Sequence, residues 1–201
     1  MKKSLTYAAL ATAVAAALAA GCTGGTEGAD TTGNAGSQPS TSASAEQATH
    51  NQADVTFVQG MIPHHEGAIE MADLAEGRTD NPDILDLAQR IKQAQGPEID
   101  QLNGWLDAWG VNNDMPGMDH GDMGHEMPGM GAEDMKKLEQ ANGAEFDRLF
   151  LELMIEHHQG AVDMSETVLD EGSNPEVKEL AQQIIDAQEA EINEMRSLLE
   201  G

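Results

Sequence analysis

The chain has 201 residues, with 10 basic and 36 acidic side chains and a formal net charge of −26. A charge this negative argues against nucleic acid and anionic lipid surfaces as partners. The single cysteine excludes an internal disulfide, a thiolate zinc site and an iron–sulfur cluster. Any soft-metal chemistry must therefore use thioether and imidazole donors.

Residues 1–21 have the pattern of a bacterial signal peptide that ends in a lipobox. Lys2 and Lys3 precede an apolar stretch of small residues, which closes on Leu18-Ala19-Ala20-Gly21-Cys22. This pattern predicts that Cys22 is lipidated and becomes the mature N-terminus. The protein would then be anchored in the cell membrane on its extracytoplasmic side, in the periplasm or at the cell surface. The alternatives are a plain signal peptide and an uncleaved anchor.

Residues 22–50 consist mainly of Gly, Ser, Thr, Ala and Gln, with almost no apolar side chain larger than alanine. Such a segment buries too little surface to offset its ordering entropy, so we expect a flexible tether. The remaining residues 51–201 are enough for one domain with a core. Because no second long apolar span follows, we expect contact with the membrane only through the N-terminal anchor.

The domain contains an internal duplication. With an offset of 93 residues, 54–106 aligns with 147–199 without gaps, and 20 of the 53 aligned pairs are identical. Each repeat shows two apolar runs at helical spacing, and Asn81-Pro82 and Asn174-Pro175 stand where a second helix would begin. One helical hairpin cannot bury its apolar stripe. Two hairpins therefore predict an all-α four-helix bundle.

Each repeat carries two adjacent histidines with a methionine on either side. The candidate metal ligands are Met61, His64, His65 and Met71 in the first repeat and Met154, His157, His158 and Met164 in the second. Residues three and four apart share one face of a helix, so Met61 lies beside both of its histidines. Met71 follows His64 by roughly 10 Å along the axis, so it either binds at another level or packs in the core. The alternative is that these histidines only form hydrogen bonds and these methionines only pack.

The segment 111–132 between the repeats is rich in Gly, Pro, Met and His. Its candidate ligands are Met115, Met118, His120, Met123, His125, Met127 and Met130. Thioethers are soft and neutral, and they select Cu(I) or Ag(I) over harder divalent ions. They also do not titrate, so this connector is predicted to hold metal at acid pH, where imidazole is protonated. The alternative is a linker without metal that is prone to oxidation.

The two stretches from His64 to Met71 and from His157 to Met164 resemble the HHxxA(I/V)xM signature of the domain-of-unknown-function family 305. Members of that family share a ferritin-like four-helix fold and include a periplasmic copper-binding protein. The resemblance covers about residues 50–200, and it implies this ferritin-like bundle and copper binding. It also implies that the signature positions His64, His65, Met71, His157, His158 and Met164 carry the family's site.

These observations predict an extracytoplasmic copper-binding lipoprotein that is not an enzyme. It would sequester or transfer Cu(I) in copper homeostasis or resistance, with Ag(I) as a surrogate ion. One alternative is a dinuclear-metal or other metal-dependent oxidase, and another is an interaction module with structural histidines. The Glu-x-x-His and His-Glu-x-x-His patterns of dinuclear oxidases and zinc hydrolases are absent. The sequence leaves open a homo-oligomer, a copper-transfer partner, and the relative direction of the first and third helices.

Overall fold

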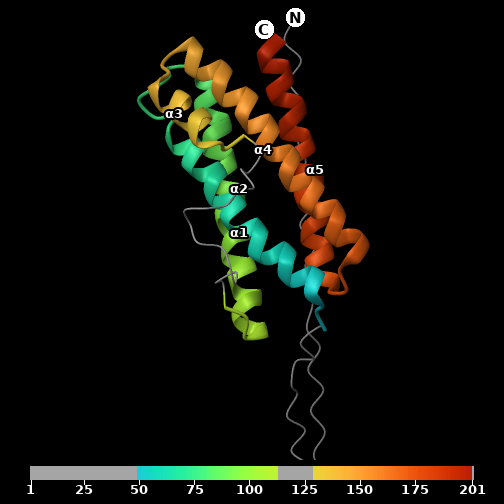
Figure 1. Ribbon diagram of the computed structural model, residues 1–201. Helices are drawn as coiled ribbons and strands as arrows, with labels where there is room; N and C mark the ends of the chain where they lie inside the picture. The colour runs from blue at the N-terminus through green and yellow to red at the C-terminus, as the bar shows by residue number, and fades with distance from the viewer. Residues whose placement is uncertain (1–48, 113–128, 201) are drawn as a thin grey trace, which may run out of the picture. The chain divides into compact units, whose positions relative to one another are not determined.

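The computed structural model describes residues 49–112 and 129–200. Within these ranges the regular secondary structure is entirely helical: α1 (Gln52–Asp73), α2 (Pro82–Trp109), α3 (Ala132–Gln140), α4 (Ala144–Glu171) and α5 (Pro175–Glu200). Helices α1 and α2 form one hairpin, and α4 and α5 form the other (Figure 1). The prediction of an all-α bundle made from two duplicated hairpins is confirmed. The predicted signal segment, nearly all of the tether and most of the connector lie outside the described residues.

The helices begin at the residues whose chemistry favours a helix start. Asn51 caps α1, and Asn51 and Asp54 each accept a hydrogen bond from the other's backbone N–H, which forms a capping box. Asn81 and Asn174 each accept from an amide in the first turn of α2 and α5. The Asn-Pro pairs therefore start the second helix of each repeat, as predicted.

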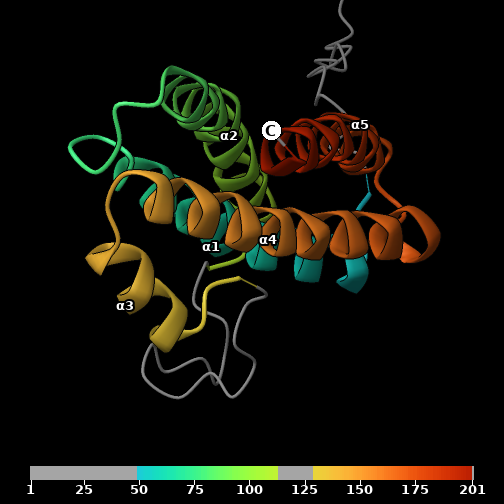
Figure 2. The ribbon, with the colours of Figure 1, turned by 90° about the horizontal axis from the view of Figure 1, so that it is seen from above.

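Helices α1 and α4 lie side by side at the centre, where the two hairpins meet, and α3 packs against α4 (Figure 2). The contacts at the helix ends show how α1 and α4 are directed relative to each other. Asn51 Nδ2, before α1, donates to the carbonyl oxygen of Glu171 at the end of α4 over 2.9 Å. Gly143 N–H, before α4, donates to the carbonyl oxygen of Arg78 over 2.7 Å. The first and third helices of the bundle are thus antiparallel, a point that the sequence left open.

Helix α3 was not predicted. It has nine residues and only Leu138 is fully buried, while Met135 packs partly buried against the core. Its N-cap is Gly131, which has no side chain to accept a hydrogen bond from the first turn. A helix this short contains too few turns to show a helical period in sequence.

The apolar core falls into two clusters. The Phe57 cluster includes Phe57, Val58, Met61, Leu102, Leu106, Ala161, Val168, Val177 and Leu180. The Phe146 cluster includes Ala68, Met71, Ile84, Leu87, Leu138, Phe146, Phe150, Met154 and Met195. Along α1 and along α4, the histidine pair lies between the members of one cluster and those of the other. We call His64, His65, His157 and His158 the histidine layer; each is 2% exposed or less.

Polar contacts join the hairpins at both ends. The buried carboxylate of Asp54 accepts hydrogen bonds from the backbone N–H groups of Ser173 and Asn174 and from the Ser173 hydroxyl, all within 3.2 Å. Asp147, the equivalent of Asp54 in the second repeat, accepts from Asn81 Nδ2 over 3.0 Å. Each aspartate therefore contacts the Asn-Pro turn of the other hairpin, which sets the register of α1 against α4.

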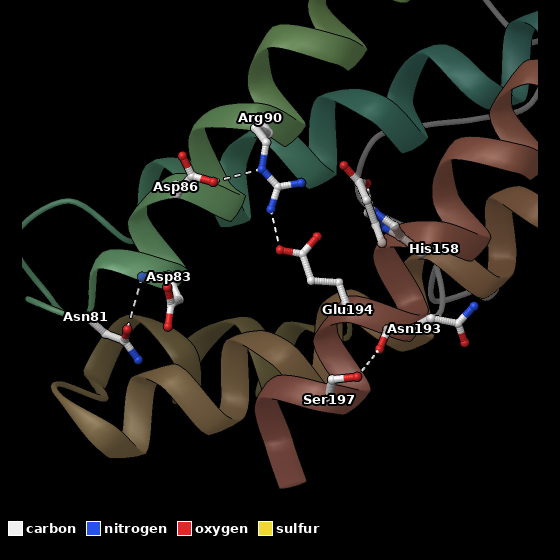
Figure 3. A network of polar contacts seen from close by, with 9 residues as sticks. Asn81, Asp83, Asp86, Arg90, His158, Asn193, Glu194 and Ser197 are labelled. Carbon is white, nitrogen blue, oxygen red and sulfur yellow. Dashed lines mark hydrogen bonds and ion pairs between the residues drawn. The ribbon is translucent and has the colours of Figure 1, made fainter. Parts of the chain in front are cut away.

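The outer helices α2 and α5 are joined by a surface ion pair. Arg90 on α2 donates to Asp86 on its own helix over 2.9 Å and to Glu194 on α5 over 2.5 Å (Figure 3). None of the helices in the described ranges is long and apolar enough to cross a membrane.

Candidate metal centre

His64 on α1 and His157 on α4 face each other where the two hairpins meet. Their ring centroids are 3.8 Å apart and their planes are inclined by 42°. Neither ring has a hydrogen-bond partner on either nitrogen among the described residues. Buried polar atoms are nearly always hydrogen-bonded, so four unpartnered ring nitrogens in one place call for a ligand.

Burial keeps these two rings neutral. It lowers the pKa of His64 from 6.5 to about 3, helped by charge repulsion from His65 and His158 and opposed in part by the nearby backbone of His157. Burial likewise lowers the pKa of His157 to about 2, helped by repulsion from the other three histidines. A neutral imidazole keeps a lone pair, which is the form that binds a metal ion.

The second histidine of each pair has a carboxylate partner on the other helix of its own hairpin. His65 Nε2 lies 2.7 Å from Glu98 Oε2, and His158 Nε2 lies 2.7 Å from Glu191 Oε2. The sequence interpretation missed both glutamates. A signal was present, because Glu98 and Glu191 are one of only two identical acidic pairs in the repeat alignment, the other being the two aspartates.

Met130 at the end of the connector reaches the histidine layer. A Cβ atom built on Gly67 would overlap the sulfur of Met130, and it would lie 3.4 Å from His157 Nε2. The backbone of Gly129, with φ +73°, lies so close to α4 that a Cβ there would overlap the Leu153 carbonyl oxygen. Two glycines thus allow a thioether to lie over α1 beside His157. The other connector candidates, from Met115 to Met127, lie outside the described residues.

The four methionines of the repeats occupy different positions. Met61 and Met154 are fully buried one turn before His64 and His157. Met71 is fully buried in the Phe146 cluster. Met164 is partly exposed, lines a cavity of about 360 Å³, and its methyl carbon would lie 2.9 Å from a Cβ built on Gly60. The structure therefore brings Met61 and Met154 next to the histidine layer and places the two signature methionines in opposite clusters.

In the two described ranges, no group of three or more His, Cys, Asp or Glu side chains is arranged to hold a metal ion. The donors that the centre of the bundle offers are instead the facing rings of His64 and His157 and the thioether of Met130. Two neutral imidazoles with a thioether form a soft donor set, which suits copper better than a hard cation.

The chain is similar to several solved structures. It is 35% identical to a DUF305 protein from Streptomyces coelicolor, with a TM-score of 0.67 over 74% of this chain and 92% of that one. It is 34% identical to a DUF305 fragment from Deinococcus radiodurans, with a TM-score of 0.66 over 76% of this chain and 97% of that one. It is also 36% identical to CopM in its Cu(II)-bound form, with a TM-score of 0.62 over 73% and 95%.

A shorter match is to the uncharacterized protein L153 of Acanthamoeba polyphaga mimivirus, with 43% identity over 54 residues, or 27% of this chain. The match spans only 36% of the length of that relative. The family model of DUF305, a domain of unknown function, matches residues 54–199. Together with the solved structures, this match shows that the chain belongs to the DUF305 family.

Proposed function

We propose that this protein binds copper outside the cytoplasm, without acting as an enzyme, and that it sequesters or transfers Cu(I). The observation that carries the proposal is the pair of buried, neutral and unpartnered rings of His64 and His157. Leaving a buried polar group without a partner costs about 1–3 kcal/mol. A bound ion would offset this cost, because it would take a lone pair from each ring.

The donor chemistry and the relatives both support copper. The thioether of Met130 beside His157 adds a soft ligand, and soft ligands favour Cu(I) and Ag(I). CopM, at 31–36% identity, has been solved in Cu(II)-bound, Cu(I)-bound and Ag-bound forms. For the other connector methionines we keep the role predicted from the sequence: a thioether site whose metal binding does not depend on imidazole protonation.

The two alternatives find less support. An oxidase with two metal ions needs a cluster of carboxylates and histidines, and the described residues contain no such cluster. An interaction module with structural histidines would have its ring nitrogens hydrogen-bonded. Both nitrogens of His64 and of His157 are buried without such a partner within the described part of the chain.

The lipid anchor on Cys22 remains part of the proposal. A DUF305 relative from Streptomyces coelicolor is described as secreted, which supports an extracytoplasmic location. Replacing Cys22 by Ser should move the full chain from the membrane fraction to the soluble extracytoplasmic fraction. Retention of the Cys22→Ser variant in the membrane would contradict lipidation.

The metal proposal is tested by anaerobic titration of the mature chain with Cu(I), Cu(II) and Zn(II). We expect Cu(I) to bind most tightly and the double variant His64→Leu/His157→Leu to lose the bundle site. His50→Leu is the matched control, because His50 stacks on Trp109 outside the histidine layer. If Zn(II) binds as tightly as Cu(I), or if the double variant binds like the control, the proposal fails.

The contribution of the connector thioether is tested with a single change. Met130→Leu keeps the volume but removes the sulfur, so we expect weaker Cu(I) binding and little change in unfolding temperature. The matched control is Met135→Leu, because Met135 is also partly buried against the Phe146 cluster. Equal Cu(I) affinities of the two variants would show that Met130 only packs.

A further inference from the structure

We propose that Glu98 and Glu191 are positioning residues that make Nδ1 of His65 and of His158 the metal-binding atoms of those rings. This inference rests on the proposed function. It divides each histidine pair into a first ring without a hydrogen-bond partner among the described residues and a second ring that a carboxylate orients.

The hydrogen-bond chemistry fixes the proton. A carboxylate can only accept, so the Nε2 atom that lies 2.7 Å from it must carry the hydrogen. A neutral ring with hydrogen on Nε2 has its lone pair on Nδ1. This is the carboxylate–histidine arrangement that orients ligands in many metal sites.

The two Nδ1 atoms are free to take a ligand. Those of His65 and His158 are buried and have no hydrogen-bond partner in the described part of the chain. Gln95 and Gln188, one turn before the glutamates, also have buried Oε1 atoms without a partner there. While the imidazoles are neutral, these four atoms are all acceptors. A cation can satisfy an excess of acceptors, whereas a further hydrogen-bond acceptor cannot.

The two rings are the chain neighbours of the facing pair. The centroids of His64 and His65 are 6.5 Å apart, with the rings edge to face. The glutamate contact occurs in both hairpins with the same separation of 33 residues and the same length. Yet the aligned residues at 96–97 and 189–190, and at 100–105 and 193–198, differ in every pair. The repeats have therefore kept the glutamates, together with Gln95/Gln188 and Ile99/Ile192, while these other nearby positions differ.

The tautomers can be read directly in the mature, ¹⁵N-labelled chain by long-range ¹H–¹⁵N correlation spectra. Without metal, we expect His65 and His158 to carry hydrogen on Nε2. On titration with Ag(I), which is diamagnetic, the Nδ1 resonances of both rings should move. If they stay in place while those of His64 and His157 move, the inference fails and the proposed function stands. If no imidazole resonance moves, the proposed function itself fails.

The variant Glu98→Gln tests the positioning role. Glutamine has nearly the same shape, but its amide can donate as well as accept, so it no longer imposes one tautomer. We expect a mixture of tautomers at His65 with His158 unchanged, and Ag(I) binding weakened by about 10-fold or more. Glu194→Gln is the matched control, because Glu194 lies on the surface of α5 and pairs with Arg90. An unchanged tautomer and affinity in Glu98→Gln would overturn the inference.

Discussion

Hairpins α1–α2 and α4–α5 carry the same polar contacts at their centres and different ones at their ends. At the centre, each hairpin has one histidine without a hydrogen-bond partner among the described residues and one histidine 2.7 Å from a glutamate. At the ends, Asp54 accepts from three backbone amides and a hydroxyl, whereas Asp147 accepts from one side-chain amide. The duplicated halves thus have equal histidine contacts at the centre and different hydrogen bonds at the ends.

The connector adds a second asymmetry, since it exists once and the hairpins exist twice. Its end places Met130 over Gly67 in the first repeat. The signature methionines differ as well, with Met71 fully buried and Met164 partly exposed beside a cavity. A centre that is symmetric in its histidines is therefore asymmetric in its thioethers.

Summed over both rings, the largest expected effect tests the equality of the two central histidines. Their lowered pKa values mean that the unfolded chain takes up protons below pH 6.5 while the folded rings stay neutral down to about pH 3. The apoprotein therefore loses stability as pH falls through this window, by about 2 kcal/mol per ring at pH 5. The free energy of unfolding, measured with urea, should therefore differ between pH 7.5 and pH 5. His64→Leu and His157→Leu should each reduce this difference by about 2 kcal/mol. If the free energy of unfolding depends differently on pH in the two variants, the two hairpins are not equivalent.

The aspartates should show the opposite behaviour, a clear difference between the hairpins. Asp54→Ala leaves the amides of Ser173 and Asn174 without their acceptor and removes the capping box of α1. We expect a loss of about 3 kcal/mol, against about 1 kcal/mol for Asp147→Ala. The two losses of stability are measured by the denaturant midpoints of the two variants at neutral pH. Equal losses would show that the ends of the hairpins are as symmetric as their centre.

A pair of glycine substitutions tests the asymmetry that Met130 introduces. At Gly104 in α2 an added Cβ meets no described atom within 4 Å, so Gly104→Ala should stabilise the protein by about 0.5–1 kcal/mol. At Gly67 the same change must displace Met130. We expect no such gain there and a Cu(I) affinity about tenfold lower. If Gly67→Ala stabilises like Gly104→Ala and binds Cu(I) normally, the thioether is not part of the centre.

The smallest effect concerns the ion pair between the outer helices. Arg90 and Glu194 are both about 40% exposed, so their contact is screened by water and salt. Arg90→Gln should cost about 0.5 kcal/mol or less, and the cost should disappear in 1 M NaCl. A larger, salt-insensitive loss measured by urea unfolding would mean that α2 and α5, and not the interior aspartates, join the hairpins.

The sequence by itself determined the hairpins, their Asn-Pro starts and the residue types at the centre. These features are local: a helical period repeats within a few turns, and a cap needs only its neighbouring amides. The duplication doubled this local signal. Helix α3 was missed because nine residues with one buried side chain give too short a period.

Only the tertiary structure decided that α1 and α4 are antiparallel and which side chains meet. Periodicity places His64 and His65 on a helix but does not tell which of them faces the other hairpin. That division follows from packing, which turns His64 toward His157 and His65 toward Glu98, across separations of 93 and 33 residues. Met130 was predicted as a connector ligand, and its position over Gly67 depends on the fold. Contacts between distant segments depend on how whole helices dock, and no pattern within one helix encodes that.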